Sequence, residues 1–136
     1  MIKVLMTDDH KILRERLKRM LDDSGDITVV AEAGSSMELF AQLTVAPCDV
    51  IVLDISLPGG SGLDALKQLR EDYPAIPVLI LSMHPEDEFA LCAIRSGAVG
   101  YLSKETAADH LVQAIKTVHA GGTFISASLA AKLSAQ

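Results

Sequence analysis

Short apolar runs along the chain alternate with stretches of helical periodicity. The runs predict five β-strands, at residues 2–7, 27–33, 50–53, 78–81 and 99–102. The third and fourth runs are continuous rather than alternating, which is typical of strands covered by helices on both faces. The chain is therefore expected to bury a central sheet between two layers of helices.

The segments between these runs show the spacing of amphipathic helices. Leu111, Ala114, Ile115 and Val118 recur at i, i+3, i+4 and i+7, so they lie on one helical face. A second such face is formed by Leu13, Leu17, Met20 and Leu21. Strict alternation of strand and helix implies crossover connections and a parallel sheet, so the predicted fold class is α/β.

Polar residues and glycines mark where the helices begin and end. Capping boxes are predicted at three helix starts, from the pairs Ser35 and Glu38, Ser61 and Asp64, and Thr106 and Asp109. Pro85 suits a first helical turn, while Gly97 and Gly121-Gly122 suit helix ends. We expect one domain over residues 1–122, followed by a short helical or linker tail at 123–136 that is rich in Ala and Ser.

Composition excludes several classes of protein. Hydrophobic residues make up 49% and charged residues 22% of the 136, which is not the signature of a disordered chain. The apolar runs are far shorter than the roughly 18 residues of a membrane-spanning helix, and Lys3 with the cluster Thr7-Asp8-Asp9 interrupts the apolar region that a signal sequence needs. A net charge of −6 disfavours binding to a nucleic-acid backbone. We therefore expect a cytoplasmic domain that does not bind membranes.

Chemistry-bearing residues stand where the predicted strands end. Asp8 and Asp9 end the first strand, Asp54 the third and Ser82 the fourth, while Lys104 follows the fifth. Ligands of open α/β sheets bind outside the carboxyl ends of the strands, so these side chains are expected to converge at one edge. Each residue alone would be ordinary surface, but the joint pattern predicts a site.

Three adjacent carboxylates repel one another unless a cation neutralises them. A hard divalent ion such as Mg²⁺ suits their oxygen atoms. Lys104 would otherwise form a salt bridge, but beside a metal it can hold a phosphoryl oxygen. An aspartate carboxylate is also a nucleophile toward phosphorus and would give an acyl phosphate. The constellation thus predicts Mg²⁺-dependent phosphoryl chemistry.

Four segments resemble the receiver domain of two-component response regulators: LMTDDH, VIVLDISLPGGSGLD, VLILSMH and GAVGYLSK. Within that family, GAVGYLSKE followed by LVQAIKTVHAGGTFIS resembles the bacterial NarL/LuxR-type transcriptional regulators. The resemblance covers residues 1 to about 122. It implies a flavodoxin-like (βα)5 fold with a five-stranded parallel sheet in the order 2-1-3-4-5.

The resemblance assigns a role to each motif position. It implies that Asp54 is the phosphoacceptor and that Lys104 contacts the phosphoryl group. Asp9, Asp54 and the backbone carbonyl of Ser56 would ligate Mg²⁺ directly, and Asp8 would reach the ion through water.

Other matched positions concern switching and the lifetime of the phosphorylated state. Ser82 matches the switch hydroxyl, and Tyr101 matches the aromatic residue whose rotamer follows the switch. Met83, His84 and Ser56 match positions that tune phosphorylation and dephosphorylation. Met83 stands where a small residue is frequent, and it is either a restriction on access to the phosphoryl group or a gap-filling side chain.

The resemblance also implies partners. A sensor histidine kinase would supply the phosphoryl group, and phosphorylation would change the surface of the fourth helix, fifth strand and fifth helix and favour a homodimer. The chain would hydrolyse its acyl phosphate slowly without being a turnover enzyme. A DNA-binding domain would follow residue 136, so DNA would be contacted only outside this chain.

Three other interpretations stay open. A stand-alone receiver would act only through protein contacts. A Mg²⁺-dependent aspartyl phosphatase would need an acid two residues after its nucleophile, where this chain has Ser56. A flavin-binding module is disfavoured, because the exit of the first strand is acidic. His10, directly after the acid pair, is interpreted as helix-start surface, with contact to the acids as the alternative.

Overall fold

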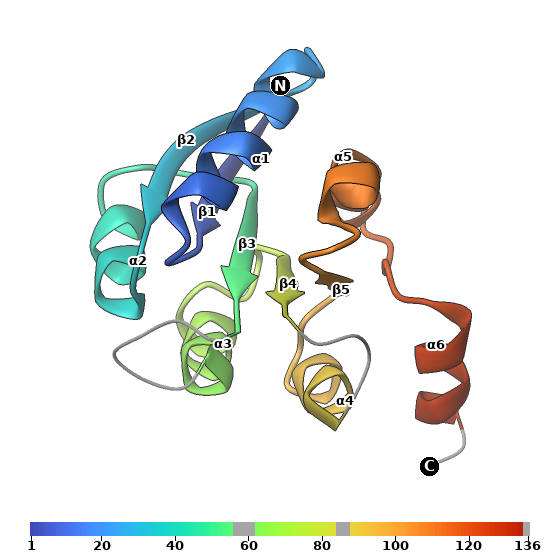
Figure 1. The fold of residues 1–136 in the computed structure, drawn as a ribbon. Helices are drawn as coiled ribbons and strands as arrows, with labels where there is room; N and C mark the ends of the chain where they lie inside the picture. Colours follow the sequence, from blue (N-terminus) through green and yellow to red (C-terminus); the bar gives the residue numbers. More distant parts are fainter. Residues whose placement is uncertain (56–61, 84–87, 135–136) are drawn as a thin grey trace.

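The computed structural model describes residues 1–55, 62–83 and 88–134 (Figure 1). Five parallel strands form one sheet in the order β2-β1-β3-β4-β5, which confirms the predicted fold class and strand order. The strands are β1 (Ile2–Thr7), β2 (Ile27–Ala33), β3 (Val50–Asp54), β4 (Val78–Ser82) and β5 (Gly100–Ser103). The helices are α1 (Lys11–Asp23), α2 (Ser36–Leu43), α3 (Gly62–Asp72), α4 (Glu88–Arg95), α5 (Ala107–His119) and α6 (Ala127–Ser134).

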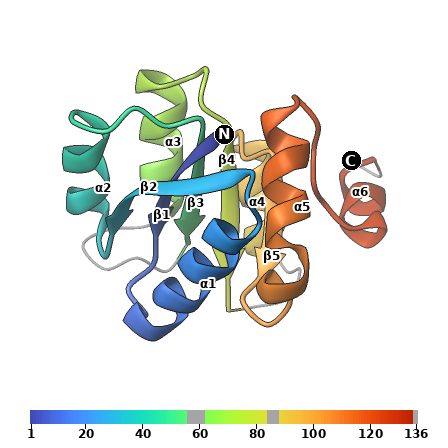
Figure 2. The same ribbon diagram turned by 90° about the horizontal axis from the view of Figure 1, so that it is seen from above.

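Helices cover both faces of the sheet (Figure 2). On one face, α1 and α5 bury Leu17 and Leu111 against the side chains of the central strands. On the other face, α2, α3 and α4 bury Leu39, Leu66 and Ala93. Every residue of β3 and β4 is buried, as the continuous apolar runs predicted. Within the part of the chain that the structure describes, no helix is long and apolar enough to cross a bilayer.

Local signals fixed some element boundaries and missed others. Ser35 caps α2 as predicted, because its hydroxyl accepts the Glu38 amide at 3.2 Å. The capping box predicted at Thr106 is wrong. The Thr106 hydroxyl makes no cap hydrogen bond. It lies 3.0 Å from the hydroxyl of Ser103, the last residue of β5, and bonds to it instead. The pair Ser61 and Asp64 and the residue Pro85 involve positions outside the described residues.

The sheet order puts a topological switch point at the carboxyl ends of β1 and β3. β1 lies between β2 and β3, so the connection leaving β1 runs to one side and the connection leaving β3 runs to the other. In doubly wound sheets the loops diverge at such a switch point and leave an open space between them. The residues that end β1 and β3 lie at this switch point.

Residues 123–134, which we call the C-terminal strap, follow α5 and end in α6 (Figure 1). Phe124 forms a parallel bridge with Gly100: its amide donates to the Val99 carbonyl at 2.9 Å, and its carbonyl accepts the Tyr101 amide at 3.0 Å. A Cβ at Gly100 would collide with Leu79 and would lie 3.3 Å from the Phe124 carbonyl, so glycine permits this close approach. Helix α6 then packs on α4, with Leu129 fully buried.

Candidate functional site

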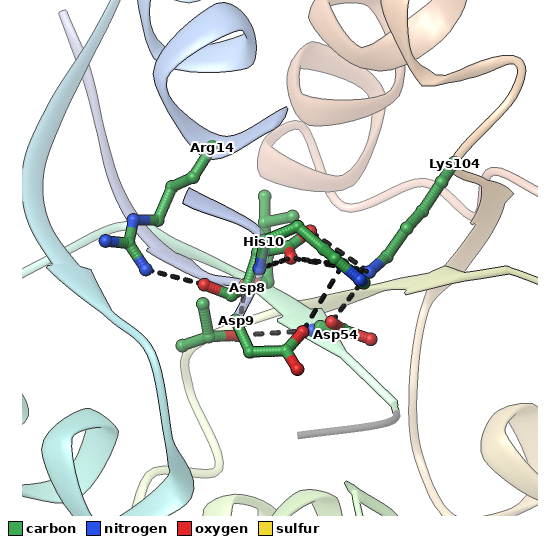
Figure 3. Close-up of polar contacts among 8 residues, drawn as sticks. Asp8, Asp9, His10, Arg14, Asp54 and Lys104 are labelled. Atoms are coloured by element: carbon green, nitrogen blue, oxygen red, sulfur yellow. Dashed lines mark hydrogen bonds and ion pairs between the residues drawn. The ribbon is translucent and has the colours of Figure 1, made fainter. Parts of the chain in front are cut away.

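Buried charges gather at the carboxyl edge of the sheet (Figure 3). Asp8 follows β1, Asp54 ends β3 and Lys104 follows β5, and the side chains of both aspartates are fully buried. The Lys104 ammonium lies 2.8 Å from Asp54 Oδ2 and 3.3 Å from both carboxylate oxygens of Asp8. The structure therefore brings together the acids and the lysine that the sequence predicted to converge.

Thr7 fixes the end of β3 from the neighbouring strand. Its hydroxyl donates to the Val52 carbonyl at 2.7 Å and accepts the Asp54 amide at 3.2 Å. Both groups are buried, so these hydrogen bonds hold the Asp54 backbone in register with β1. Sequence analysis missed Thr7, and its position directly before the acid pair was the signal available.

Lys104 is held by both its backbone and its side chain. Its amide donates to the Ser82 carbonyl at 2.7 Å, which ties the start of the loop after β5 to the end of β4. The side chain crosses the ends of the strands to Asp54 and is only 5% exposed. A single ammonium thus faces two buried carboxylates, so these three groups carry a net negative charge.

Asp8 is held in place by hydrogen bonds, but one of its carboxylate oxygens accepts none from the described residues. Its Oδ1 accepts the His10 amide at 2.7 Å, and its backbone carbonyl accepts Arg14 at 2.6 Å. Its Oδ2 is buried and accepts no hydrogen bond from the described residues. A buried carboxylate oxygen without a donor is costly unless a cation approaches it. This oxygen fits a cation site.

The donor set suits a divalent ion. One ligand atom from each of Asp8, Asp9, His10 and Asp54 lies within 4.8 Å of the others. Three of these residues offer carboxylate oxygens, which Mg²⁺ prefers. The residues present therefore fit the predicted Mg²⁺, whose charge would offset that of the carboxylates.

His10 takes part in this cluster, although sequence analysis favoured a surface position. Its side chain is 53% exposed, yet Nδ1 lies 2.8 Å from Lys104 Nζ, 3.2 Å from Asp8 Oδ1 and 3.3 Å from Asp9 Oδ1. The alternative interpretation, contact with the acids, matches the structure. Position along the sequence alone did not tell which way the ring points.

The predicted switch and tuning residues lie on β4 or β5, directly after β4, or outside the described part of the chain. Ser82 is fully buried at the end of β4, adjacent to β3. Tyr101 is 5% exposed on β5, in register with Ile80 of β4. Met83 is 57% exposed, so the gap-filling interpretation is wrong. Ser56 and His84 lie outside the described residues.

Curated relatives align with this chain over nearly its whole length. It is 36% identical over 133 residues to the response regulator GacA of Pseudomonas syringae pv. syringae, covering 98% of this chain and 62% of that protein. It is 38% identical to the DNA-binding transcriptional activator DevR/DosR of Mycobacterium tuberculosis, covering 100% of this chain and 63% of that protein. The chain thus spans about three fifths of the length of these relatives.

Solved structures agree with the sequence relatives. The chain superposes on a two-component response regulator of the LuxR family from Aurantimonas sp. SI85-9A1 with a TM-score of 0.88 and 34% identity, covering 98% of this chain and 95% of that one. The family model described as "Response regulator receiver domain" matches residues 4–116. The match includes the acid pair, Asp54, Ser82 and Lys104. This chain therefore belongs to the response regulator receiver domain family and is of the LuxR/NarL type.

Proposed function

We propose that Asp54 of this chain accepts a phosphoryl group from the phosphohistidine of a sensor histidine kinase. The observation that carries the proposal is the contact between the buried Asp54 carboxylate and Lys104 at 2.8 Å, beside two further acids. A carboxylate paired with a positive charge in a crevice is positioned to meet an incoming phosphoryl group. Receiver domains in general are not turnover enzymes, and we propose that this one resets by slow hydrolysis of its own acyl phosphate.

The transfer is a simple displacement at phosphorus. An Asp54 oxygen forms the new bond to phosphorus, while the bond from phosphorus to the kinase imidazole breaks and its electron pair stays on the imidazole nitrogen. Lys104 moves from the carboxylate to a phosphoryl oxygen and neutralises part of its charge. Mg²⁺, held by Asp9 and Asp54 with the Ser56 carbonyl and reached by Asp8 through water, would screen the negative charge that otherwise repels the donor.

Ser82 and Tyr101 are proposed to report the phosphorylated state. Ser82 is buried at the end of the strand that pairs with β3, which supports a role in which its hydroxyl turns toward the new phosphoryl group. Tyr101 lies on the next strand, beside a cavity of about 400 Å³ that also borders Phe124 of the strap. That cavity offers space for a change of the Tyr101 rotamer. Met83 and His84 are proposed to adjust how long the phosphoryl group persists.

The output is proposed to be transcriptional. DevR/DosR is named a DNA-binding transcriptional activator, and this chain matches 63% of its length. The net charge of −6 makes these 136 residues a poor DNA-binding surface, so DNA contact is assigned to a separate C-terminal domain. We propose that phosphorylation alters the surface of α4, β5 and α5 and promotes a homodimer.

The phosphoacceptor is tested by intact mass spectrometry. The purified chain is incubated with Mg²⁺ and acetyl phosphate, and separately with a phosphorylated histidine kinase. One phosphoryl adduct is expected on the wild type and on Asp109→Asn, an exposed acid on α5. No adduct is expected on Asp54→Asn or after Mg²⁺ is chelated. An adduct on Asp54→Asn, or none on the wild type with either donor, would contradict the proposal.

The switch is tested by fluorine NMR after incorporation of 3-fluorotyrosine. The chain has two tyrosines, Tyr101 on β5 and Tyr73, which follows α3. Phosphorylation is expected to shift the Tyr101 signal and to leave the Tyr73 signal in place. Ser82→Ala is expected to remove that shift while the mass adduct still forms. Equal shifts of both signals would assign the change to the whole domain and reject Tyr101 as a specific reporter.

A further inference from the structure

We propose that His10 is a nitrogen ligand of the divalent cation, and that it makes this site bind first-row transition ions such as Co²⁺ more tightly than an all-oxygen site would. The proposal rests on the proposed function only in taking the acidic cluster as a divalent-cation site. It adds a fourth protein side chain to that site and the chemical class of ion that it favours.

The first argument is the direction of the imidazole lone pair. Lys104 Nζ lies 2.8 Å from His10 Nδ1, and in the tautomer in which Nδ1 accepts from this ammonium, the lone pair of Nδ1 faces the cluster. The same ammonium contacts Asp54 Oδ2 at 2.8 Å. In this structure Lys104 therefore occupies a cation position defined by one nitrogen and carboxylate oxygens. A metal ion entering that position would meet the same lone pairs.

The second argument is independent of His10. Asp8 Oδ2 is buried in the same cluster and accepts no hydrogen bond from the described residues. Lys104 approaches it at 3.3 Å without donating to it. The cluster therefore has carboxylate capacity beyond what one ammonium satisfies, and a doubly charged ion would use it.

The third argument concerns how the ring is held. His10 precedes α1 as its N-cap residue, with extended backbone, and its amide donates to Asp8 Oδ1 at 2.7 Å. This hydrogen bond places the start of the side chain over the acids rather than over α1. Nδ1 lies 3.2 Å from Asp8 Oδ1 and 3.3 Å from Asp9 Oδ1, which is close enough for these atoms to share one ion.

The ligand atoms of the site determine which divalent ions it binds more tightly. Mg²⁺ prefers oxygen ligands and gains little from imidazole, whereas Co²⁺, Ni²⁺ and Zn²⁺ bind imidazole well. In a receiver with an apolar or an oxygen-bearing side chain at this position, the relative affinities for these ions would depend on the carboxylates alone. Here the ranking is expected to shift toward the transition ions.

The test compares the wild type with His10→Asn, because asparagine is itself a favourable N-cap and should preserve α1. His110→Asn, on the exposed surface of α5, is the matched control for histidine binding elsewhere. Calorimetry with Mg²⁺ and with Co²⁺ measures both affinities for each protein. The visible absorption band of bound Co²⁺ is recorded alongside, since it reports directly whether nitrogen is a ligand.

In His10→Asn we expect the Co²⁺ dissociation constant to rise about tenfold or more and the Mg²⁺ constant to change less than about twofold. The Co²⁺ band should shift in His10→Asn and stay unchanged in His110→Asn. Equal changes for both ions, or no change for Co²⁺, would overturn the proposal.

Phosphorylation with Mg²⁺ separates this inference from the proposed function. His10→Asn should still form the mass adduct on Asp54, because Mg²⁺ keeps its oxygen ligands. If the adduct forms while Co²⁺ binding is unaffected, the nitrogen-ligand proposal alone fails. If neither ion binds the wild type, the divalent-cation site fails as well, and with it the proposed Mg²⁺ chemistry.

Discussion

The strand-end cluster and the C-terminal strap are held in place by opposite kinds of interaction. In the cluster, Asp8, Asp54 and Lys104 are nearly inaccessible to water, and the Lys104 ammonium lies 2.8 Å from Asp54 and 3.3 Å from Asp8. In the strap, Leu129 is fully buried, and backbone hydrogen bonds join Phe124 to Tyr101 of β5 and to Val99 just before it. The cluster therefore depends on what ions are present, while the strap depends on apolar packing.

This difference has a functional meaning. The cluster has more carboxylates than cations, so a small cationic ligand that binds there can raise the free energy of unfolding strongly. An apolar contact responds little to ions, but it is sensitive to small shifts in its neighbours. Tyr101 stands between the two regions, on β5, and its amide donates to the strap at Phe124. The proposed phosphorylation of Asp54 would therefore be passed to the apolar packing of the strap through β5.

The largest effect is expected from Lys104→Met, which removes the positive charge between two buried carboxylates. Breaking a buried ion pair on one side typically costs about 3–5 kcal/mol of unfolding free energy. Without Mg²⁺, the variant should therefore unfold at markedly lower urea concentration. Because a ligand that binds only the folded state stabilises it, adding Mg²⁺ should restore part of this loss.

The matched control is Lys116→Met, which removes an exposed lysine paired with Asp26 at 2.7 Å. It should lose little stability, and Mg²⁺ should not change that loss. If Lys104→Met lost no more stability than Lys116→Met, the buried carboxylates would not depend on Lys104 to offset their repulsion.

A smaller effect, insensitive to Mg²⁺, is expected from Leu129→Ala in the strap. Truncating a fully buried leucine costs about 2–4 kcal/mol when the cavity does not collapse. Leu133→Ala, at a half-buried position on the same helix, should cost less. Urea unfolding with and without Mg²⁺ measures both. A Leu129→Ala loss that Mg²⁺ restores would show that the strap is coupled to the cluster rather than held separately.

The cluster was more predictable from the sequence than the strap for a topological reason. Strands of a parallel sheet all end at the same edge, so Asp9, Asp54 and Lys104 had to converge once the strands were identified. The strap is rich in Ala and Ser and shows only a weak apolar pattern, and its helix was one of two interpretations of residues 123–136. Pairing of Phe124 with β5 has no signature in the sequence, since it depends on Gly100 lying at the sheet edge.

Within the site, the sequence predicted which residues meet but not how they are supported. Thr7 reads as part of a strand, and its role appears only when its hydroxyl is seen to bond the Asp54 amide. His10 reads as a helix start, and the direction of its ring depends on the hydrogen bond to Asp8. Thr106 had the spacing of a cap but bonds Ser103, because tertiary neighbours compete with local ones.

The smallest effect is expected when the pH is lowered and Asp26 is protonated. Asp26 forms an exposed ion pair with Lys116, unlike the buried acids of the cluster. A hydrogen bond and the charge of Lys116 lower the pKa of Asp26 from its usual 3.8. The unfolded chain therefore binds a proton more readily than the folded one, so this pair's contribution is present above pH 3.8 and is lost as the pH falls through the lowered pKa. The difference in urea midpoint between wild type and Lys116→Met should shrink over that range, and added salt should shrink it at neutral pH. Because both side chains are about half exposed, solvent screens the pair, and a difference as large as that of Lys104→Met would mean that burial is not what makes the cluster strong.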